Sequence, residues 1–356
     1  MTITELEQEF AKKIGVKYCI GVNSGTSALH ACLYAMGVQS GDEVISPALT
    51  VIMNTFVTLY LDATPIYVDI NPNTFVVEAS EIAKYITPKT KAIQIVSLSG
   101  QPCDITPIME LADKHGIPIL EDNCQCFLGK YKDGRTVGSV ATMSVFSTES
   151  SKHISSGEGG FICTNDESLA YKARKFAGLG YRTLTASEGR PKLKKELFHD
   201  PHFKRHDMVG FNYRLPQACI DLLVPQIQRL EEIVERRVRN GKAFDAILST
   251  CPYFKLQQSE GCINTYWSCT VSYNGPISWM EFYDRFRKNG GEGFHGSLSI
   301  PYREPVMNER LPYPVSCPIA ENLQPTLMLF HTNYKTDEAL NVQIDALQKT
   351  IKELGW

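Results

Sequence analysis

Short apolar runs alternate with amphipathic stretches along the first 240 residues. The runs have the length and composition of strands, and the stretches between them, such as SEIAKYI and ITPIMELADKHG, repeat apolar residues at helical spacing. Thr2 and Glu5 form a capping box that predicts a helix at the start of the chain. This alternation predicts an α/β fold with a mostly parallel sheet flanked by helices. The predicted strands cover residues 18–22, 43–47, 65–70, 91–98, 117–122, 143–148 and 159–164.

The pattern changes after residue 180. Residues 181–205 form an excursion without clear periodicity, in which seven Lys or Arg stand against three acids. Long excursions of this kind in compact domains are often functional. A helix-rich run over 215–249 follows, and the rest of the chain has the pattern of a smaller α+β domain. We therefore expect a large domain over 1–240 and a small C-terminal domain over 241–356.

Composition narrows the class of protein. A length of 356 residues suggests about two domains, and 43% hydrophobic with 21% charged residues is ordinary for a globular protein. The net charge of −3 argues against nucleic-acid and membrane-surface partners, and no apolar run has the length of a membrane span. The N-terminus shows no secretory signal, so a cytoplasmic protein is expected. The eleven scattered cysteines favour reduced thiols, and their spacing predicts no metal site.

Polar residues follow the predicted strands where ligands of parallel sheets bind. In NSGTSAL, Gly25 permits a tight turn, and Thr26 and Ser27 open a helix whose free N–H groups suit a phosphate. Taken alone, this segment is better explained as an ordinary helix cap. Asp122 ends an apolar strand, where a carboxylate needs a cation or hydrogen-bond donors, and Gln125 follows closely. Asp122 either caps the next turn or holds a proton on a heteroaromatic nitrogen.

Lys152 lies between the predicted buried strands 143–148 and 159–164 and precedes the turn SSGEGG. Most lysines are solvated, but this placement favours an amine that forms a Schiff base. Asn212, in GFNYRLP, is expected to open a long helix, in which case it can be a simple N-cap. A phosphate anchor, a partner for a pyridinium and an isolated lysine are together what pyridoxal 5′-phosphate (PLP) requires.

The order of these motifs resembles the DegT/DnrJ/StrS family of PLP-dependent sugar aminotransferases, which have the type I PLP-aminotransferase fold. EDNCQC is similar to the family's EDAAQA, STESSKHISSGEGG to its SFxxxKxITTGEGG, GFNYRLP to its GxNYRM, and VSLSGQPCD to its VHLYGQPAD. The likeness extends from NSGTSAL to CPIAENL, which is almost the whole chain.

The resemblance implies a role for each matching residue. Lys152 would bind the aldehyde of PLP and later move a proton, Asp122 would keep the pyridine nitrogen protonated, and Gln125 would contact the phenolic oxygen. The chain would be a homodimer with shared active sites, alternating between PLP and its aminated form, PMP. The implied phosphate-binding residues are Thr26, Ser27 and Ser147, with Asn212 from the partner subunit.

The chain departs from the family pattern near the expected substrate. Val51 stands where many relatives place an aromatic residue against the PLP ring. Ser97 and Ser99 replace the family's His and Tyr, and FHGSLSIPYREP, with His295, occupies the region of its HYxPLH stretch. Ser97, Ser99 and His295 are therefore candidate substrate contacts.

The expected reaction transfers an amino group from glutamate or glutamine to a keto sugar, expected to be linked to a nucleotide. Arg190, Lys194 and Lys195 in the excursion are candidates for binding its diphosphate, although a solvated surface loop explains their charge equally well. The alternatives are an acceptor that is a small phosphorylated ketone or a cyclitol, a PMP-dependent sugar dehydratase, and a non-catalytic binding protein. Dehydratases of this family replace the Schiff-base lysine with histidine, whereas this chain keeps Lys152.

Overall fold

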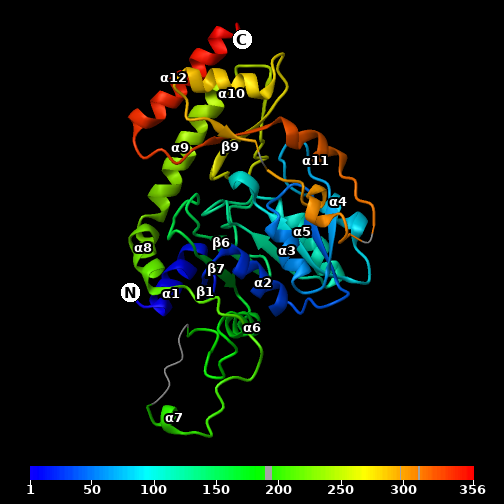
Figure 1. Cartoon of the computed structure of the whole chain (residues 1–356), viewed down its shortest axis with the longest axis vertical. Helices are drawn as coiled ribbons and strands as arrows, with labels where there is room; N and C mark the ends of the chain where they lie inside the picture. Colours follow the sequence, from blue (N-terminus) through cyan, green and yellow to red (C-terminus); the bar gives the residue numbers. More distant parts are fainter. Residues whose placement is uncertain (189–194, 297, 312) are drawn as a thin grey trace.

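A seven-stranded sheet occupies the centre of the larger part of the molecule (Figure 1). The computed structural model describes residues 1–188, 195–296, 298–311 and 313–356. The strand order is β1-β7-β6-β5-β4-β2-β3, and only β7 runs antiparallel to its neighbours, which confirms the predicted mostly parallel sheet. The strands are β1 (Tyr18–Val22), β2 (Glu43–Pro47), β3 (Thr64–Val68), β4 (Thr90–Val96), β5 (Ile119–Asp122), β6 (Met143–Ser147) and β7 (Gly160–Thr164).

Helices cover both faces of this sheet, because its strands alternate apolar side chains between two sides. Ile162 of β7 packs beneath α2 and α6, whereas its neighbours Phe161 and Cys163 pack with α1 and α8 on the opposite face. Helix α5 covers that opposite face further along the sheet. The helices of this part are α1 (Ile3–Ile14), α2 (Gly25–Ala35), α3 (Met53–Leu59), α4 (Ala79–Ile82), α5 (Ile105–His115), α6 (Glu167–Ala177) and α8 (Gln217–Gln228), with 3-10 turns η1 (Ala83–Tyr85) and η2 (Leu98–Gly100).

A second, antiparallel sheet lies in the C-terminal part, with strand order β10-β11-β9-β8. Its hydrophobic core is formed with α9, α10 and α12, and Figure 1 shows these helices around β9. The elements are β8 (Phe254–Leu256), β9 (Ser268–Tyr273), β10 (Phe294–His295), β11 (Leu327–His331), α9 (Leu230–Leu248), α10 (Trp279–Lys288), α11 (Pro318–Leu323), α12 (Asp337–Glu353), η3 (Pro301–Arg303), η4 (Pro305–Met307) and η5 (Gln324–Thr326).

Two segments connect the parts more closely than the predicted division at residue 240 implies. That division falls inside α9, whose first residues pack with the large sheet, whereas Phe244 and Leu248 pack with the second sheet. Ile300 and Tyr302, from the C-terminal part, join the hydrophobic core beneath the large sheet. The small sheet is thus held against the edge of the large sheet by a continuous helix and a returning loop.

A buried ion pair joins α1 to α6. The guanidinium of Arg174 contacts the carboxylate of Glu7 at 2.9 Å, and both side chains are almost fully buried. The second carboxylate oxygen of Glu7 accepts a hydrogen bond from the N–H of Gly21 at 2.8 Å, in β1. Burial raises the pKa of Glu7, and the charge of Arg174 opposes that rise. The pair therefore fixes two helices on opposite faces of the sheet to its β1 edge.

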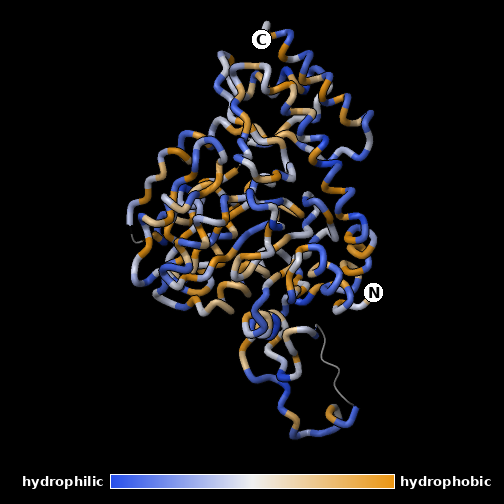
Figure 2. The backbone as a smooth tube through the Cα atoms, turned by 180° about the vertical axis from the view of Figure 1, so that it is seen from behind, coloured by the Kyte–Doolittle hydropathy of each residue, from blue (hydrophilic) through white to orange (hydrophobic). Residues whose placement is uncertain are grey.

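The described residues of the basic excursion, 181–188 and 195–205, project from the body of the molecule below α6 in Figure 1, and Figure 2 shows them from behind. Helix α7 (Lys195–His199) lies at its far end, and an ion pair between Lys175 and Asp207 holds its base. Lys195 is therefore remote from the second sheet of its own chain, while Arg190 and Lys194 lie outside the described residues. No helix within the described ranges combines the length and apolar character needed to cross a membrane.

Candidate active site

The carboxyl ends of three neighbouring strands meet the start of α2 at one cavity of about 260 Å³, here called the inner cavity. Val96, Asp122 and Ser147 are the last residues of β4, β5 and β6, and all three line it. The topology therefore brings together side chains from segments more than 100 residues apart. The described lining residues are Ser24, Gly25, Thr26, Leu29, Val51, Met53, Val96, Asp122, Cys124, Gln125, Ser147, Glu149, Lys152 and Glu158.

The start of α2 forms a cradle for an anion. The first N–H groups of a helix have no partner within it, and Gly25 and Thr26 present them at the inner cavity. A Cβ on Gly25 would lie 3.0 Å from both the Sγ of Cys124 and the Cβ of Ser147, so only glycine leaves this space open. The hydroxyl of Ser27 donates to the Oδ1 of Asn23 at 2.7 Å, and Ser27 is not among the described residues that line the cavity, so its contact with a phosphate stays a prediction.

Two donors orient the carboxylate of Asp122. Its Oδ2 accepts a hydrogen bond from the Nδ2 of Asn54 at 2.9 Å, and its Oδ1 accepts one from the N–H of Cys124 at 3.0 Å. Asn54 comes from the first turn of α3 and is completely buried. Both contacts fix the orientation of this carboxylate at the inner cavity, where it can pair with a protonated heteroaromatic nitrogen.

Gln125 is oriented by the backbone of Ser99. The Oε1 of Gln125 accepts a hydrogen bond from the Ser99 N–H at 2.7 Å, which directs its amide nitrogen toward the cavity as a donor. The hydroxyls of Ser97 and Ser99 are buried. Ser97 donates to the Oδ1 of Asn123 at 2.7 Å, and Ser99 accepts from Thr270 at 2.8 Å. Both hydroxyls have partners within the protein, and neither residue is among the described residues that line the two cavities, so their contact with a substrate stays a prediction.

Lys152 follows β6 and its half-buried side chain lines the inner cavity. Its Nζ lies 4.7 Å from the centre of the Trp267 ring, a cation–π contact that keeps the amine inside. Arg237 of α9 fixes the loop that carries this lysine. Its Nη2 donates to the carbonyls of Lys152 at 2.6 Å and Ser151 at 3.2 Å, while its Nη1 donates to that of Trp267 at 3.2 Å. The position of the amine is thus set by both parts of the molecule.

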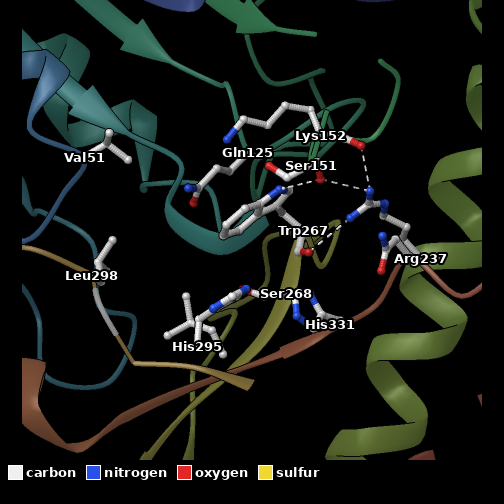
Figure 3. Close-up of a pocket in the computed structure, with 12 residues that line it drawn as sticks. Val51, Gln125, Ser151, Lys152, Arg237, Trp267, Ser268, His295, Leu298 and His331 are labelled. Atoms are coloured by element: carbon white, nitrogen blue, oxygen red, sulfur yellow. Dashed lines mark hydrogen bonds between the residues drawn. The ribbon is translucent and has the colours of Figure 1, made fainter. Parts of the chain in front are cut away.

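A second cavity of about 440 Å³, here called the outer cavity, separates Lys152 from the face of the small sheet (Figure 3). Val51, Gln125 and Lys152 line both cavities, so the two are continuous at these residues. Val51 thereby borders the site where the sequence placed it, and His295 lines the outer cavity as a candidate substrate contact should. The described lining residues are Val51, Gln125, Ser151, Lys152, Arg237, Trp267, Ser268, His295, Leu298, Leu329, His331 and Asn333.

Asn212 lies on the surface in an extended segment. It forms a bridge with Gly178, its Oδ1 accepts from the Nε of Arg214 at 2.9 Å, and neither cavity includes it. The prediction that it opens a long helix is wrong, because α8 begins at Gln217 with Pro216 as its N-cap. Pro216 has no N–H and its extended backbone marks the end of the loop. Asn212 therefore contributes nothing to the site of its own chain.

Sequence reasoning missed Asn54, Arg237, Trp267 and His331. Each reaches the site from an element distant in the sequence, and each stands in an apolar or helical run that carries no local signal of a ligand. Ser24 lines the inner cavity, whereas Ser27 does not. The sequence could have indicated Ser24, because an N-cap serine stands directly before the first residue of a helix.

These residues fit PLP. The cradle at Gly25 accepts a phosphate, the oriented carboxylate of Asp122 suits a pyridinium, and the amine of Lys152 suits an aldehyde. Fold and site together define a PLP-dependent enzyme of the type I aminotransferase fold. The model of the DegT/DnrJ/EryC1/StrS aminotransferase family matches residues 1–339, and the chain belongs to this family.

Curated relatives include enzymes that act on nucleotide-linked sugars. The chain is 39% identical to GDP-perosamine synthase of Caulobacter vibrioides over 239 residues, which cover 67% of this chain and 59% of that protein. It is 34% identical to GDP-perosamine synthase of Escherichia coli O157:H7 over 269 residues, covering 76% and 69%. Identity to UDP-2-acetamido-2-deoxy-3-oxo-D-glucuronate aminotransferase of Pseudomonas aeruginosa is 36% over 247 residues, covering 69% and 63%. The matched region thus spans less than two thirds of the Caulobacter and Pseudomonas proteins.

Solved structures give the same fold. An aminotransferase from Psychrobacter cryohalolentis has a TM-score of 0.89 at 26% identity, covering 99% of this chain and 92% of that one. GDP-4-keto-6-deoxy-D-mannose-3-dehydratase from E. coli has a TM-score of 0.85 at 22% identity, covering 97% and 91%. The second match, at 22% identity, shows the fold alone. Aminotransferases and a dehydratase share this fold.

Proposed function

We propose that this protein transfers an amino group from glutamate or glutamine to the keto group of a nucleotide-linked sugar. The observation that carries the proposal is the meeting of Lys152, Asp122, Gln125 and the start of α2 at the inner cavity. The outer cavity, which opens at the same lysine, offers room for the substrate. The nucleotide-sugar activities named for the relatives support the class of acceptor.

Each residue of the site has a separate role in the proposed reaction. When bound, PLP supplies an aldehyde that takes up the amino group and a ring that accepts the electrons of the breaking C–H bond. Gly25 and Thr26 would hold the phosphate, and Gln125 would donate to the phenolic oxygen. Asp122 would hold the proton on the ring nitrogen, and the amine of Lys152 would remove and return the proton at the substrate carbon.

The test is product analysis with a panel of acceptors. Purified protein is converted to its aminated form with ¹⁵N-glutamate or with glutamine labelled with ¹⁵N at its α-amino group, and is then mixed with GDP- and UDP-linked keto sugars, small keto phosphates and a keto cyclitol. We expect ¹⁵N in an amino sugar that keeps its nucleotide. A deoxy sugar formed with no ¹⁵N would establish the dehydratase, ¹⁵N only in a small keto phosphate or cyclitol would establish that acceptor class, and no reaction would favour a binding protein.

We also propose that the protein works as a cytoplasmic homodimer with shared active sites. Tyr60 and Phe211 are 56% and 42% exposed, and both contact the buried ring of His30, so they lie together on the surface. Exposed aromatic residues beside each other are typical of subunit interfaces. Asn212 is adjacent to this surface, and an interface here would let it reach a partner's inner cavity. The eleven cysteines, all free, suit a reducing compartment.

Subunit mixing tests the shared site. Lys152→Ala and Asn212→Ala subunits, each impaired alone, should regain activity when they are refolded together, because one site of each heterodimer has both residues intact. Mixtures no more active than either parent, although hybrids are shown to form, would mean that Asn212 does not act across the interface.

The basic excursion is proposed to bind the acceptor's diphosphate across the same dimer. Its projection away from the small sheet of its own chain supports a role toward a neighbour. Neutralising Arg190, Lys194 and Lys195 together should raise KM for the acceptor, less so at high salt, and leave the donor half-reaction unchanged. Unchanged acceptor kinetics would mean that the basic excursion is a solvated surface segment and does not bind the diphosphate.

A further inference from the structure

The face of the small sheet that borders the outer cavity carries two neighbouring histidines. His295 of β10 pairs with Leu329 of β11, and His331 lies two residues beyond Leu329 on the same strand. Since residues two apart share a face, both rings point to the side that Leu329 and Ser268 line. The ring centres are 4.7 Å apart at 85° to each other. Figure 3 shows them beside Ser268, across the cavity from Gln125 and Lys152.

The described ionisable residues that line the outer cavity are all basic. Among its described lining residues, the ionisable side chains are Lys152, Arg237, His295 and His331, with no carboxylate. The terminal nitrogens of Arg237 donate hydrogen bonds to carbonyl groups of the chain. Burial lowers the pKa of Arg237 to about 10, so its guanidinium stays charged at neutral pH. A cavity whose ionisable lining residues are all potential cations lowers the energy of an anionic ligand.

The imidazole rings of His295 and His331 have no hydrogen-bond partner among the described residues, so their N–H groups are available to a ligand. Burial, together with repulsion from His295 and Arg237, lowers the pKa of His331, and the charge of Glu292 nearby opposes that shift. An anion between the rings would relieve that repulsion. The apolar floor beside them comes from Leu298, Leu329 and Trp267.

We propose that His295 and His331 together bind a carboxylate of the substrate. Two adjacent rings offer one N–H each, which matches the two oxygens of a carboxylate, whereas a diphosphate would need more donors than the pair provides. The inference rests on the proposed aminotransfer and deepens it. Two sources share this chemistry, namely the side-chain carboxylate of a dicarboxylic amino donor and the carboxylate of a uronate acceptor.

Equilibrium binding tests the pair without turnover. Calorimetry on the PLP-loaded protein compares glutarate and glucuronate with their uncharged counterparts, glutaramide and glucose. We expect at least one acid to bind, and its Kd to rise at least about tenfold in the double variant His295→Gln/His331→Gln, since hydrogen bonds to charged groups are each worth a factor of this order. The exposed His115→Gln is the matched control and should bind as wild type, and circular dichroism should show both variants folded.

Kinetics then separate the two sources. If KM rises for glutamate but not for alanine, the pair binds the donor; if it rises for a keto uronate but not for the matching neutral keto sugar, it binds the acceptor. The proposal is overturned if neither acid binds better than its uncharged counterpart, if the double variant binds both as wild type does, or if it loses affinity for GDP or UDP instead. Absence of amino transfer by wild-type protein would refute the proposed function and leave the binding result to stand separately.

Discussion

Replacing Asp122 with asparagine separates the charge of this residue from its position. The carboxylate accepts one hydrogen bond on each oxygen, from Asn54 at 2.9 Å and from the N–H of Cys124 at 3.0 Å. The substituted amide would keep the shape and one acceptor but lose the negative charge that holds a proton on the ring nitrogen.

The expected loss of rate is large. Two unit charges about 4 Å apart interact by about 4 kcal/mol at an effective dielectric constant near 20. A loss of that size in the transition state is roughly a thousandfold in rate, and solvent access reduces it to a hundredfold or more. One orphaned donor should lower the free energy of unfolding by only about 1–3 kcal/mol.

The assay follows the donor half-reaction in a single turnover, by the change in cofactor absorbance after mixing with glutamate. Asn54→Ala is the matched control, because it removes a hydrogen bond to the same carboxylate and keeps the charge. We expect Asp122→Asn to be slower than Asn54→Ala by at least tenfold, with both proteins folded and loaded. Equal rates in the two variants, or a near wild-type rate in Asp122→Asn, would refute the assigned role.

Three further substitutions probe other parts of the structure. Gly25→Ala would place a Cβ 3.0 Å from the Cβ of Ser147, so the Kd for PLP, measured by fluorescence titration, should rise roughly tenfold; unchanged affinity would mean that the phosphate binds elsewhere. Ser97→Ala should lower the free energy of unfolding by about 1–3 kcal/mol and leave KM for both substrates unchanged, whereas a raised KM would establish Ser97 as a substrate contact. Glu7→Ala leaves Arg174 buried and unpaired and should cost about 3–5 kcal/mol in guanidinium unfolding; a loss below about 1 kcal/mol would show that water reaches the pair.

The strands of the large sheet were predictable because they are short apolar runs buried on both faces. The run over 117–122, for example, contains β5 at Ile119–Asp122. Two features were not predictable from periodicity. The start of α8 is set by Pro216 and not by Asn212, and α9 continues through residue 240 because its two halves pack on different sheets.

The central residues of the site were predictable because strand ends and the turn after β6 carry them in a fixed order. Their supports were not, because contacts across the fold select them. Arg237 donates to the Lys152 carbonyl across 85 residues of sequence, and Thr270 donates to Ser99 across 171. The same long-range packing buries Ser97 and Ser99, whose serine hydroxyls alone give no sign of which way they face.

Borohydride reduction of the purified protein tests the central claim most directly, namely that PLP occupies the inner cavity on the amine of Lys152. Reduction fixes the cofactor to the amine that holds it, and peptide mass spectrometry then locates the adduct. The structure predicts the adduct on Lys152 alone, and a Lys152→Ala protein that still binds PLP but yields none. An adduct on any other lysine of the wild-type protein would contradict the account.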